Sequence, residues 1–108
     1  MTLAQLAAIL NAITGFKDKV VYRAWKENEA PPLPFICFYS TGSESFGADN
    51  VTYAALTNVT IELYSRRKDP ASEALIEAAL TANDLFYDKS ETFIEAEKAV
   101  LVVYEVEV

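Results

Sequence analysis

The side chains that most often perform catalysis or hold a metal are scarce in this sequence. The chain of 108 residues contains no histidine and a single cysteine. The commonest general base and the commonest metal ligand are therefore missing, and Ser-His-Asp or Cys-His arrangements are excluded. Cys37 stands between Ile36 and Phe38 in an apolar run, so we interpret it as a buried thiol in preference to a reactive one.

Carboxylates near the C-terminus are the other group that could do chemistry, because two of them can share acid and base roles. They are Glu91, Glu95, Glu97, Glu105 and Glu107. Their positions in a predicted hairpin favour a solvated sheet face or charged rim. Asp49 and Asn50 lack the further oxygen ligands of a calcium loop, and Gly42 and Gly47 do not form a phosphate-binding pattern. We expect no metal, no cofactor and no enzymatic activity.

Three consecutive residues, Arg66-Arg67-Lys68, form the one basic cluster in a chain with 9 basic and 16 acidic residues and a net charge of −7. That balance argues against a general nucleic-acid-binding surface. Two interpretations of the cluster are open. It is either a solvated turn or a patch complementary to an acidic surface, on a different partner or on another copy of this acidic chain. Phe46, inside an otherwise polar segment, is equally compatible with core burial and with an interface.

The segment that carries the basic cluster is predicted to be a strand, a turn and a helix. From Asn58 to Tyr64 apolar residues alternate with polar ones, as in a half-buried strand. Asp69 suits the N-cap of a helix and Pro70 its first position. The apolar stripe expected to lie on the sheet comprises Leu75, Ile76, Ala79 and Leu80.

The rest of the chain completes the order α-β-β-β-α-β-β. A capping box from Thr2 to Gln5 predicts a helix over 3–13, and Tyr22 and Trp25 are expected in the core. We expect strands at 20–22, 35–40, 52–64, 90–95 and 99–108, loops at 26–34 and 42–50, the latter long and flexible, and a turn at 96–98. The predicted fold is α+β in a single domain over residues 1–108, with a mostly antiparallel sheet of about four to five strands and two helices packed on one face. No apolar run reaches the roughly 20 residues of a membrane span.

Several motifs, spread over nearly the whole chain, resemble those of a family of small tail proteins encoded by phages and prophages of low-GC Gram-positive bacteria. The motifs are Ala30–Phe35 (APPLPF), Ala48-Asp49-Asn50, Val59–Tyr64 (VTIELY), Lys68-Asp69-Pro70, Phe86-Tyr87, Glu91-Thr92, Ile94-Glu95 and Val103–Val106 (VYEV). The family is similar to the tail-completion or tail-terminator proteins of long-tailed siphophages. The resemblance implies a non-enzymatic protein that forms a ring, expected to be a hexamer, which caps the tail tube and joins it to the head connector.

The same resemblance implies where the protein acts and with what. Its partners would be further copies of itself, the tail-tube protein and the head-closure or connector proteins, in the neck of a virion assembled in the host cytoplasm. DNA would pass an acidic wall without specific binding, and no membrane would be involved. Candidate interface residues are Arg66, Arg67, Lys68, Phe46, Asp49, Asn50, Glu95 and Glu97, with the basic group facing an acidic edge that also includes Glu105 and Glu107. The alternatives are a head-closure or adaptor protein of the neck and a small soluble ligand-binding or regulatory module.

Overall fold

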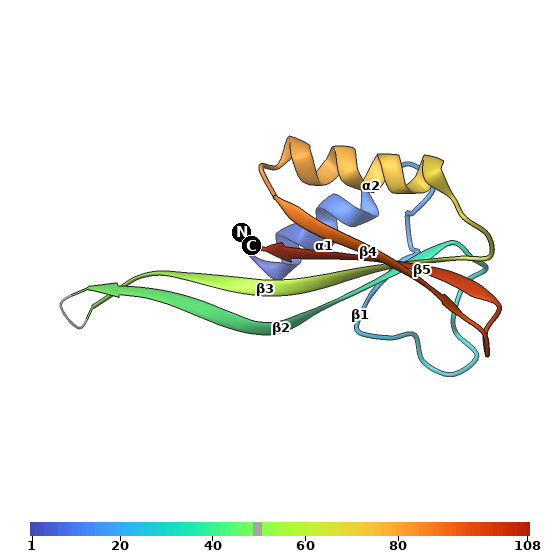
Figure 1. Ribbon diagram of the computed structural model, residues 1–108, viewed down its shortest axis with the longest axis horizontal. Coiled ribbons are helices and arrows are strands. Elements are labelled where there is room, and N and C mark those ends of the chain that lie inside the picture. The colour runs from blue at the N-terminus through green and yellow to red at the C-terminus, as the bar shows by residue number, and fades with distance from the viewer. Residues whose placement is uncertain (49–50) are drawn as a thin grey trace.

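Helices and strands follow one another in the predicted order in the computed structural model of the protein (Figure 1). The structure describes the backbone of residues 1–48 and 51–108 and the side chains of residues 1–43 and 56–108. The elements are α1 (Leu3–Asn11), β1 (Val20–Tyr22), β2 (Phe35–Ala48), β3 (Val51–Ser65), α2 (Pro70–Ala82), β4 (Tyr87–Ile94) and β5 (Ala99–Glu107). The prediction of an α+β fold with this element order is confirmed.

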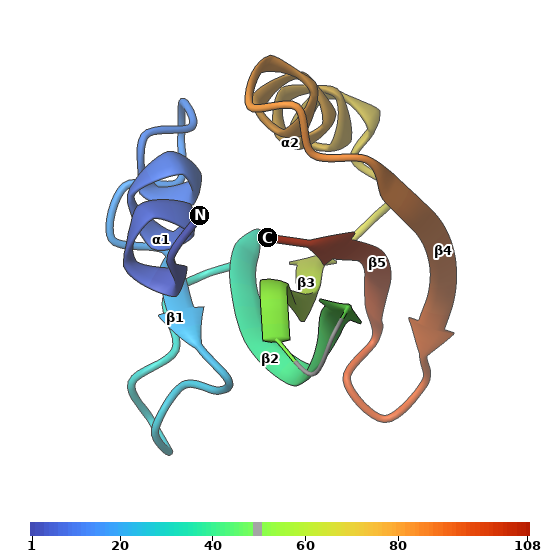
Figure 2. The same ribbon diagram turned by 90° about the vertical axis from the view of Figure 1, so that its left-hand side faces the viewer.

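The strands form a five-stranded sheet in the order β1-β2-β3-β5-β4. β1 runs parallel to β2, and each of the other neighbouring pairs is antiparallel. Both helices cover the same face of the sheet, with α1 nearer to β1 and α2 nearer to β4 (Figure 2). A mostly antiparallel sheet with two helices on one face is what the sequence predicts.

The hydrophobic core lies between the helices and this face of the sheet. Val59, Ile61 and Leu63 alternate along β3 and are at most 1% exposed. Five of their six register partners on the neighbouring strands extend the same apolar layer, and these are Phe38, Ile36, Val106, Tyr104 and Val102. Side chains of a strand alternate between its two faces, so the register alone brings these residues together. The helices close the layer with Leu6, Leu10, Ile76 and Leu80, none of which is exposed.

Helix α2 begins as predicted. Asp69 is its N-cap, since the carboxylate accepts hydrogen bonds from the Ser72 N–H at 3.2 Å and from the Ser72 hydroxyl at 2.7 Å. Pro70 occupies the first helical position, where a backbone N–H would have no partner within the helix, so proline costs no hydrogen bond there. The cap thereby fixes where the turn that carries Arg66 and Arg67 ends.

Replacing Asp69 with alanine should lower the free energy of unfolding by about 1 kcal/mol, because the first turn of α2 loses the acceptor for its free N–H groups. Urea unfolding followed by circular dichroism measures the loss. Glu27→Ala, in an exposed loop, is the matched removal of an acidic side chain. Equal stability of the two variants would contradict the capping role.

The buried stripe of α2 differs from its prediction at two positions, because Leu75 is exposed and Glu73 is buried. Leu75 is 41% exposed, although it was expected to lie on the sheet. It lines a shallow groove together with Ile9 of α1, so it faces the other helix. Glu73 is only 3% exposed, because ion pairs with residues of the turn and of β4 compensate its burial.

Smaller differences concern the ends of elements and the edge of the sheet. The capping box forms, with the Thr2 N–H donating to Gln5 Oε1 at 2.8 Å and the Gln5 N–H donating to Thr2 Oγ1 at 3.1 Å, but α1 ends at Asn11. β4 starts at Tyr87, three residues before the prediction. Tyr22 is 46% exposed and not a core residue, because β1 is an edge strand. Trp25 is half-buried, with its ring edge against Phe35.

The largest departure from the predictions is segment 42–50. A long flexible loop was expected, but residues 42–48 continue β2 and pair with β3. Asp49 and Asn50 lie outside the described residues. The third strand reaches only as far as Thr57, which exchanges backbone hydrogen bonds with Val108, so beyond it β2 and β3 run on together. We call residues 41–48 and 51–56 the arm. It projects from the body (Figure 1) and contributes to a molecule 51 Å long but only 27 by 23 Å across.

The loop prediction failed because a polar, glycine-containing segment can still satisfy its backbone through strand pairing. Register shifts between Ser40 and Gly42 and between Phe46 and Gly47 interrupt the regular ladder. Such bulges bend and twist a ribbon without ending it. No described helix of the chain is long and apolar enough to cross a membrane.

Candidate functional site

The arm is the first candidate interface, since within the described structure each of its strands has only the other as a neighbour. Eight residues of strand extend roughly 25 Å. An isolated two-stranded ribbon is marginally stable in water, and its two outer edges present unpaired N–H and C=O groups. The arm therefore has the geometry of an element that is completed by another surface. The backbone of Phe46, a predicted interface residue, lies in the arm opposite Ala54.

The predicted basic cluster is divided in the structure. Arg66 and Arg67 are exposed in the turn between β3 and α2, and neither forms an ion pair with a described side chain. Lys68 Nζ instead lies 2.9 Å from Glu73 Oε1 and also contacts Glu91 Oε1. Two arginines remain available to a partner, while Lys68 is engaged within the chain.

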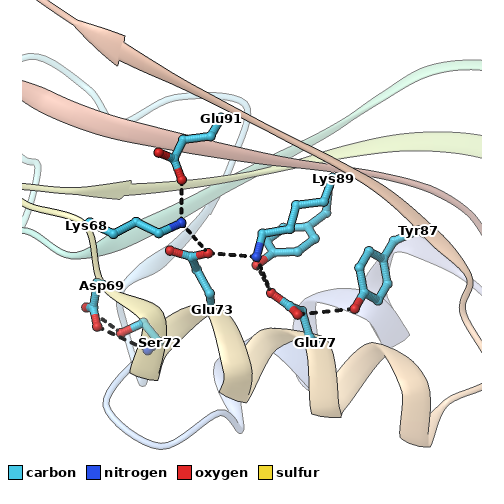
Figure 3. A network of polar contacts seen from close by, with 9 residues as sticks. Lys68, Asp69, Ser72, Glu73, Glu77, Tyr87, Lys89 and Glu91 are labelled. Atoms are coloured by element: carbon cyan, nitrogen blue, oxygen red, sulfur yellow. Dashed lines mark hydrogen bonds and ion pairs between the residues drawn. The ribbon is translucent and has the colours of Figure 1, made fainter.

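Lys68 belongs to a network of charged side chains that joins α2 to β4 (Figure 3). We call it the α2–β4 network. Lys89 Nζ lies 2.7 Å from Glu73 Oε1 and 2.8 Å from Glu77 Oε2. The hydroxyl of Tyr104 donates to Glu77 Oε2 at 2.8 Å, and that of Tyr87 donates to Glu77 Oε1 at 3.3 Å. One buried edge of the helix is thereby held to two strands by charge-assisted hydrogen bonds.

The pKa shifts in the α2–β4 network favour the charged forms. Burial acts to raise the pKa of Glu73, but hydrogen bonds from Lys89 and Lys68 outweigh it and leave that pKa below its usual value. The hydrogen bond from Lys89 likewise lowers the pKa of Glu77. Hydrogen bonds to Glu73 and Glu77 raise the pKa of Lys89. At neutral pH the two carboxylates are therefore ionised and the amine is protonated, so opposite charges hold α2 to β4.

The face of the sheet away from the helices carries a second polar group. The hydroxyls of Tyr39 and Tyr64 donate to the two oxygens of Glu62, at 3.3 and 3.2 Å. Cys37 is Glu62's register partner and is 4% exposed, which confirms that its thiol is buried. Burial, followed by the nearby charge of Glu62, raises the pKa of Cys37 to about 11. This thiol is not poised for nucleophilic attack.

Cys37 should react with a thiol reagent at pH 8 at least about 100-fold more slowly in the native protein than in 8 M urea. Its raised pKa leaves only about one thiol in a thousand ionised at that pH, against about one in ten at the ordinary pKa, and burial hinders the reagent further. Absorbance at 412 nm during reaction with a disulfide reagent measures both rates. Native labelling within seconds would contradict the buried assignment.

The residues of the predicted acidic edge are divided between two opposite ends of the sheet. Glu95 and Glu97 are exposed in the turn between β4 and β5, where Glu95 pairs with Lys98 at 3.1 Å. This turn is at the same end as the arginines, because Ser65 is the register partner of Val100. Glu105 and Glu107 are at the other end of β5, near the start of the arm.

A hollow of about 500 Å³ lies at that other end, where β4 starts and β5 finishes. We call it the acidic hollow. Its charged lining is Asp84, Asp88, Glu105 and Glu107, and its apolar lining includes Leu56, Phe86 and Val106. Phe86 is 92% exposed, the most exposed of the large hydrophobic side chains in the described part of the chain. The sequence motifs do not predict this hollow, although Asp84 and Asp88 on either side of the aromatic pair Phe86-Tyr87 are a signal for it.

No group of three or more His, Cys, Asp or Glu side chains within the described ranges has the geometry to hold a metal ion. No protein-family model matches the chain, and no curated protein matches it at a significant level.

Proposed function

We propose that the protein is a non-enzymatic assembly subunit of a phage tail, a tail-completion or tail-terminator protein. It forms a ring, expected to be a hexamer, that caps the tail tube in the virion neck and joins it to the head connector. The motifs from Ala30 to Val106 that resemble such proteins support the phage assignment. The observation that carries the assembly role is the arm.

The arm supports an assembly role because its backbone pairs only within itself. Residues 42–48 of β2 pair with β3 alone, and residues 51–56 of β3 pair with β2 alone. Ordering backbone costs about 1–2 kcal/mol per residue. A partner that pairs with an open edge of the arm or covers one of its faces would offset this cost, as in other cases of strand addition.

The charge of the chain is compatible with a ring around DNA. A net charge of −7 disfavours the phosphate contacts through which proteins bind DNA and release counterions. A channel lined by such subunits would let the duplex slide. A head-closure or adaptor layer of the neck would use the same arm and charge, so the choice between layers depends on which neighbour the ring contacts.

Shortening the arm tests the assembly role. Replacing residues 44–56 with Asn-Gly leaves a two-residue hairpin turn between Ser43 and Thr57, two residues that face each other in the register. We expect rings of the unmodified chain at high concentration, seen by light scattering and negative-stain microscopy. The shortened chain should remain monomeric, with a melting temperature within about 3 °C of the unmodified one. Substitutions of Glu27 and Glu29 by serine, in an exposed loop, control for surface changes.

A second experiment tests the position in the neck. Adding the protein during polymerisation of tail-tube protein should stop elongation and leave a ring at one end of each tube. A ring that binds the portal or connector proteins and leaves tube length unchanged would support the adaptor alternative. A chain that stays monomeric at every concentration, and that neither stops tube elongation nor binds the portal or connector proteins, would contradict the terminator and the adaptor assignments.

A further inference from the structure

The acidic hollow places like charges beside one another without a described counter-charge. Asp88 of β4 is the direct register partner of Glu105 of β5, an arrangement that destabilises a sheet. None of the four carboxylates of the hollow takes part in an ion pair with a described side chain, and no basic residue lines it. A positively charged occupant would relieve this repulsion.

The lining of the hollow narrows the chemistry of that occupant. The described carboxylates do not form a cluster that could hold a metal ion, so a compact inorganic cation is a poor fit. Phe86, 92% exposed, adds an aromatic surface to the acidic one. A guanidinium group can both form a bidentate pair with a carboxylate and stack on an aromatic ring. The combination favours arginine.

Arginines with these properties lie at the opposite end of the same sheet. Arg66 and Arg67 follow the end of β3, whereas Asn58, a residue of the hollow, stands seven residues earlier on the same strand. Seven strand residues span roughly 23 Å, so a chain cannot bring its own arginines to its own hollow. Two different patches at opposite ends of one subunit are the arrangement that a head-to-tail contact requires, and such contacts close into rings.

We propose that the acidic hollow receives the Arg66-Arg67 turn of a neighbouring copy of this chain. The inference rests on the ring proposed above and identifies one of its contacts. It assigns no intersubunit role to Lys68, which is held by Glu73 and Glu91, or to Glu95 and Glu97, which lie at the arginine end of the sheet. Phe86 is the aromatic anchor of the contact.

Two charge-reversed chains test the contact. In the first chain Arg66 and Arg67 are replaced by glutamate, so that an acidic turn meets an acidic hollow. In the second chain Asp88, Glu105 and Glu107 are replaced by arginine, so that Asp84 is the one acidic residue left in the lining and a basic turn meets a basic hollow. Each chain alone should dissociate at least tenfold more readily than the unmodified protein in analytical ultracentrifugation. An equimolar mixture should regain the oligomer, because each turn then finds a hollow of opposite charge in an alternating ring.

Control variants distinguish the loss of this contact from effects of net charge and of misfolding. Glu29→Lys with Glu95→Lys and Glu97→Lys, three exposed positions outside the hollow, changes the net charge as much as the second chain but should leave assembly intact. Phe86→Ala should weaken assembly, and Arg66→Lys with Arg67→Lys should weaken it less than reversal does. If the unmodified chain forms oligomers and both charge-reversed chains form them equally well, the contact is wrong but the ring is not. An unmodified chain that never assembles would overturn the ring as well.

Discussion

Replacing Tyr104 with alanine is expected to lower the free energy of unfolding by about 3–5 kcal/mol, the largest loss that we expect from a single substitution in this chain. Tyr104 is fully buried in the middle of β5. Its ring packs edge-on against Tyr87 at 5.4 Å between centroids, and its hydroxyl donates to Glu77. The truncation removes an aromatic ring from the core and a donor from the α2–β4 network. A domain of ordinary stability, about 5–15 kcal/mol, would lose a large part of it.

Tyr104→Phe is the matched control, because it removes the hydroxyl and keeps the ring. Glu77 retains Lys89 and Tyr87 as donors, so this variant should lose only about 1–2 kcal/mol. Urea unfolding monitored by circular dichroism compares the three proteins. If the alanine variant unfolds within about 1 kcal/mol of the phenylalanine variant, the ring is not a central packing element of the core.

The secondary structure was predictable where local signals and burial agree. Asp69 and Pro70 place the start of α2, and the alternation of Val59, Ile61 and Leu63 identifies the buried face of β3. These signals act within a few residues, so they can be read without knowing the partners of each element. The order of elements then followed, and with it the α+β class.

The arm was not predictable by the same route. Its sequence from Gly42 to Ala48 lacks the apolar alternation that marks a strand packed on a core. The described arm residues pair through their backbone with β3, and backbone hydrogen bonds leave little trace in side-chain type. The polar, glycine-containing composition therefore indicated a loop. The alternation of apolar and polar residues that marks a strand reports the burial of its side chains, and backbone pairing does not require that alternation.

The candidate site was predictable in part for a related reason. Arg66 and Arg67 stand out as a local cluster, but the residues that engage Lys68 come from α2 and β4 and meet it only in three dimensions. Glu73 and Glu77 gave a signal that could have been used. They lie one helical turn apart beside Ile76 and Leu80 on the buried stripe, where an unpaired carboxylate would be costly. Carboxylates in that place predict basic partners on the facing strand.

Replacing Glu73 with alanine should lower the free energy of unfolding by about 2 kcal/mol at pH 7, because α2 loses the carboxylate that accepts from Lys89 and Lys68. The loss is smaller than for two fully buried ion pairs, since the side chain of Lys68 is half exposed and solvent screens its charge. The variant also removes Glu73 Oε2, a buried oxygen without a hydrogen-bond partner. Glu91→Ala, which removes an exposed partner of Lys68, should change stability by less than about 0.5 kcal/mol.

The cost of Glu73→Ala should depend on pH in a defined direction. The folded protein holds the pKa of Glu73 below its ordinary value of 4.5, so folding favours the ionised carboxylate. That stabilisation is complete at neutral pH and is lost as the pH falls through the lowered pKa. Urea unfolding at pH 7 and near pH 3 should therefore show a smaller difference between the variant and the unmodified chain in acid. A difference that is equal at both pH values would mean that Glu73 stabilises α2 by packing and not by its charge.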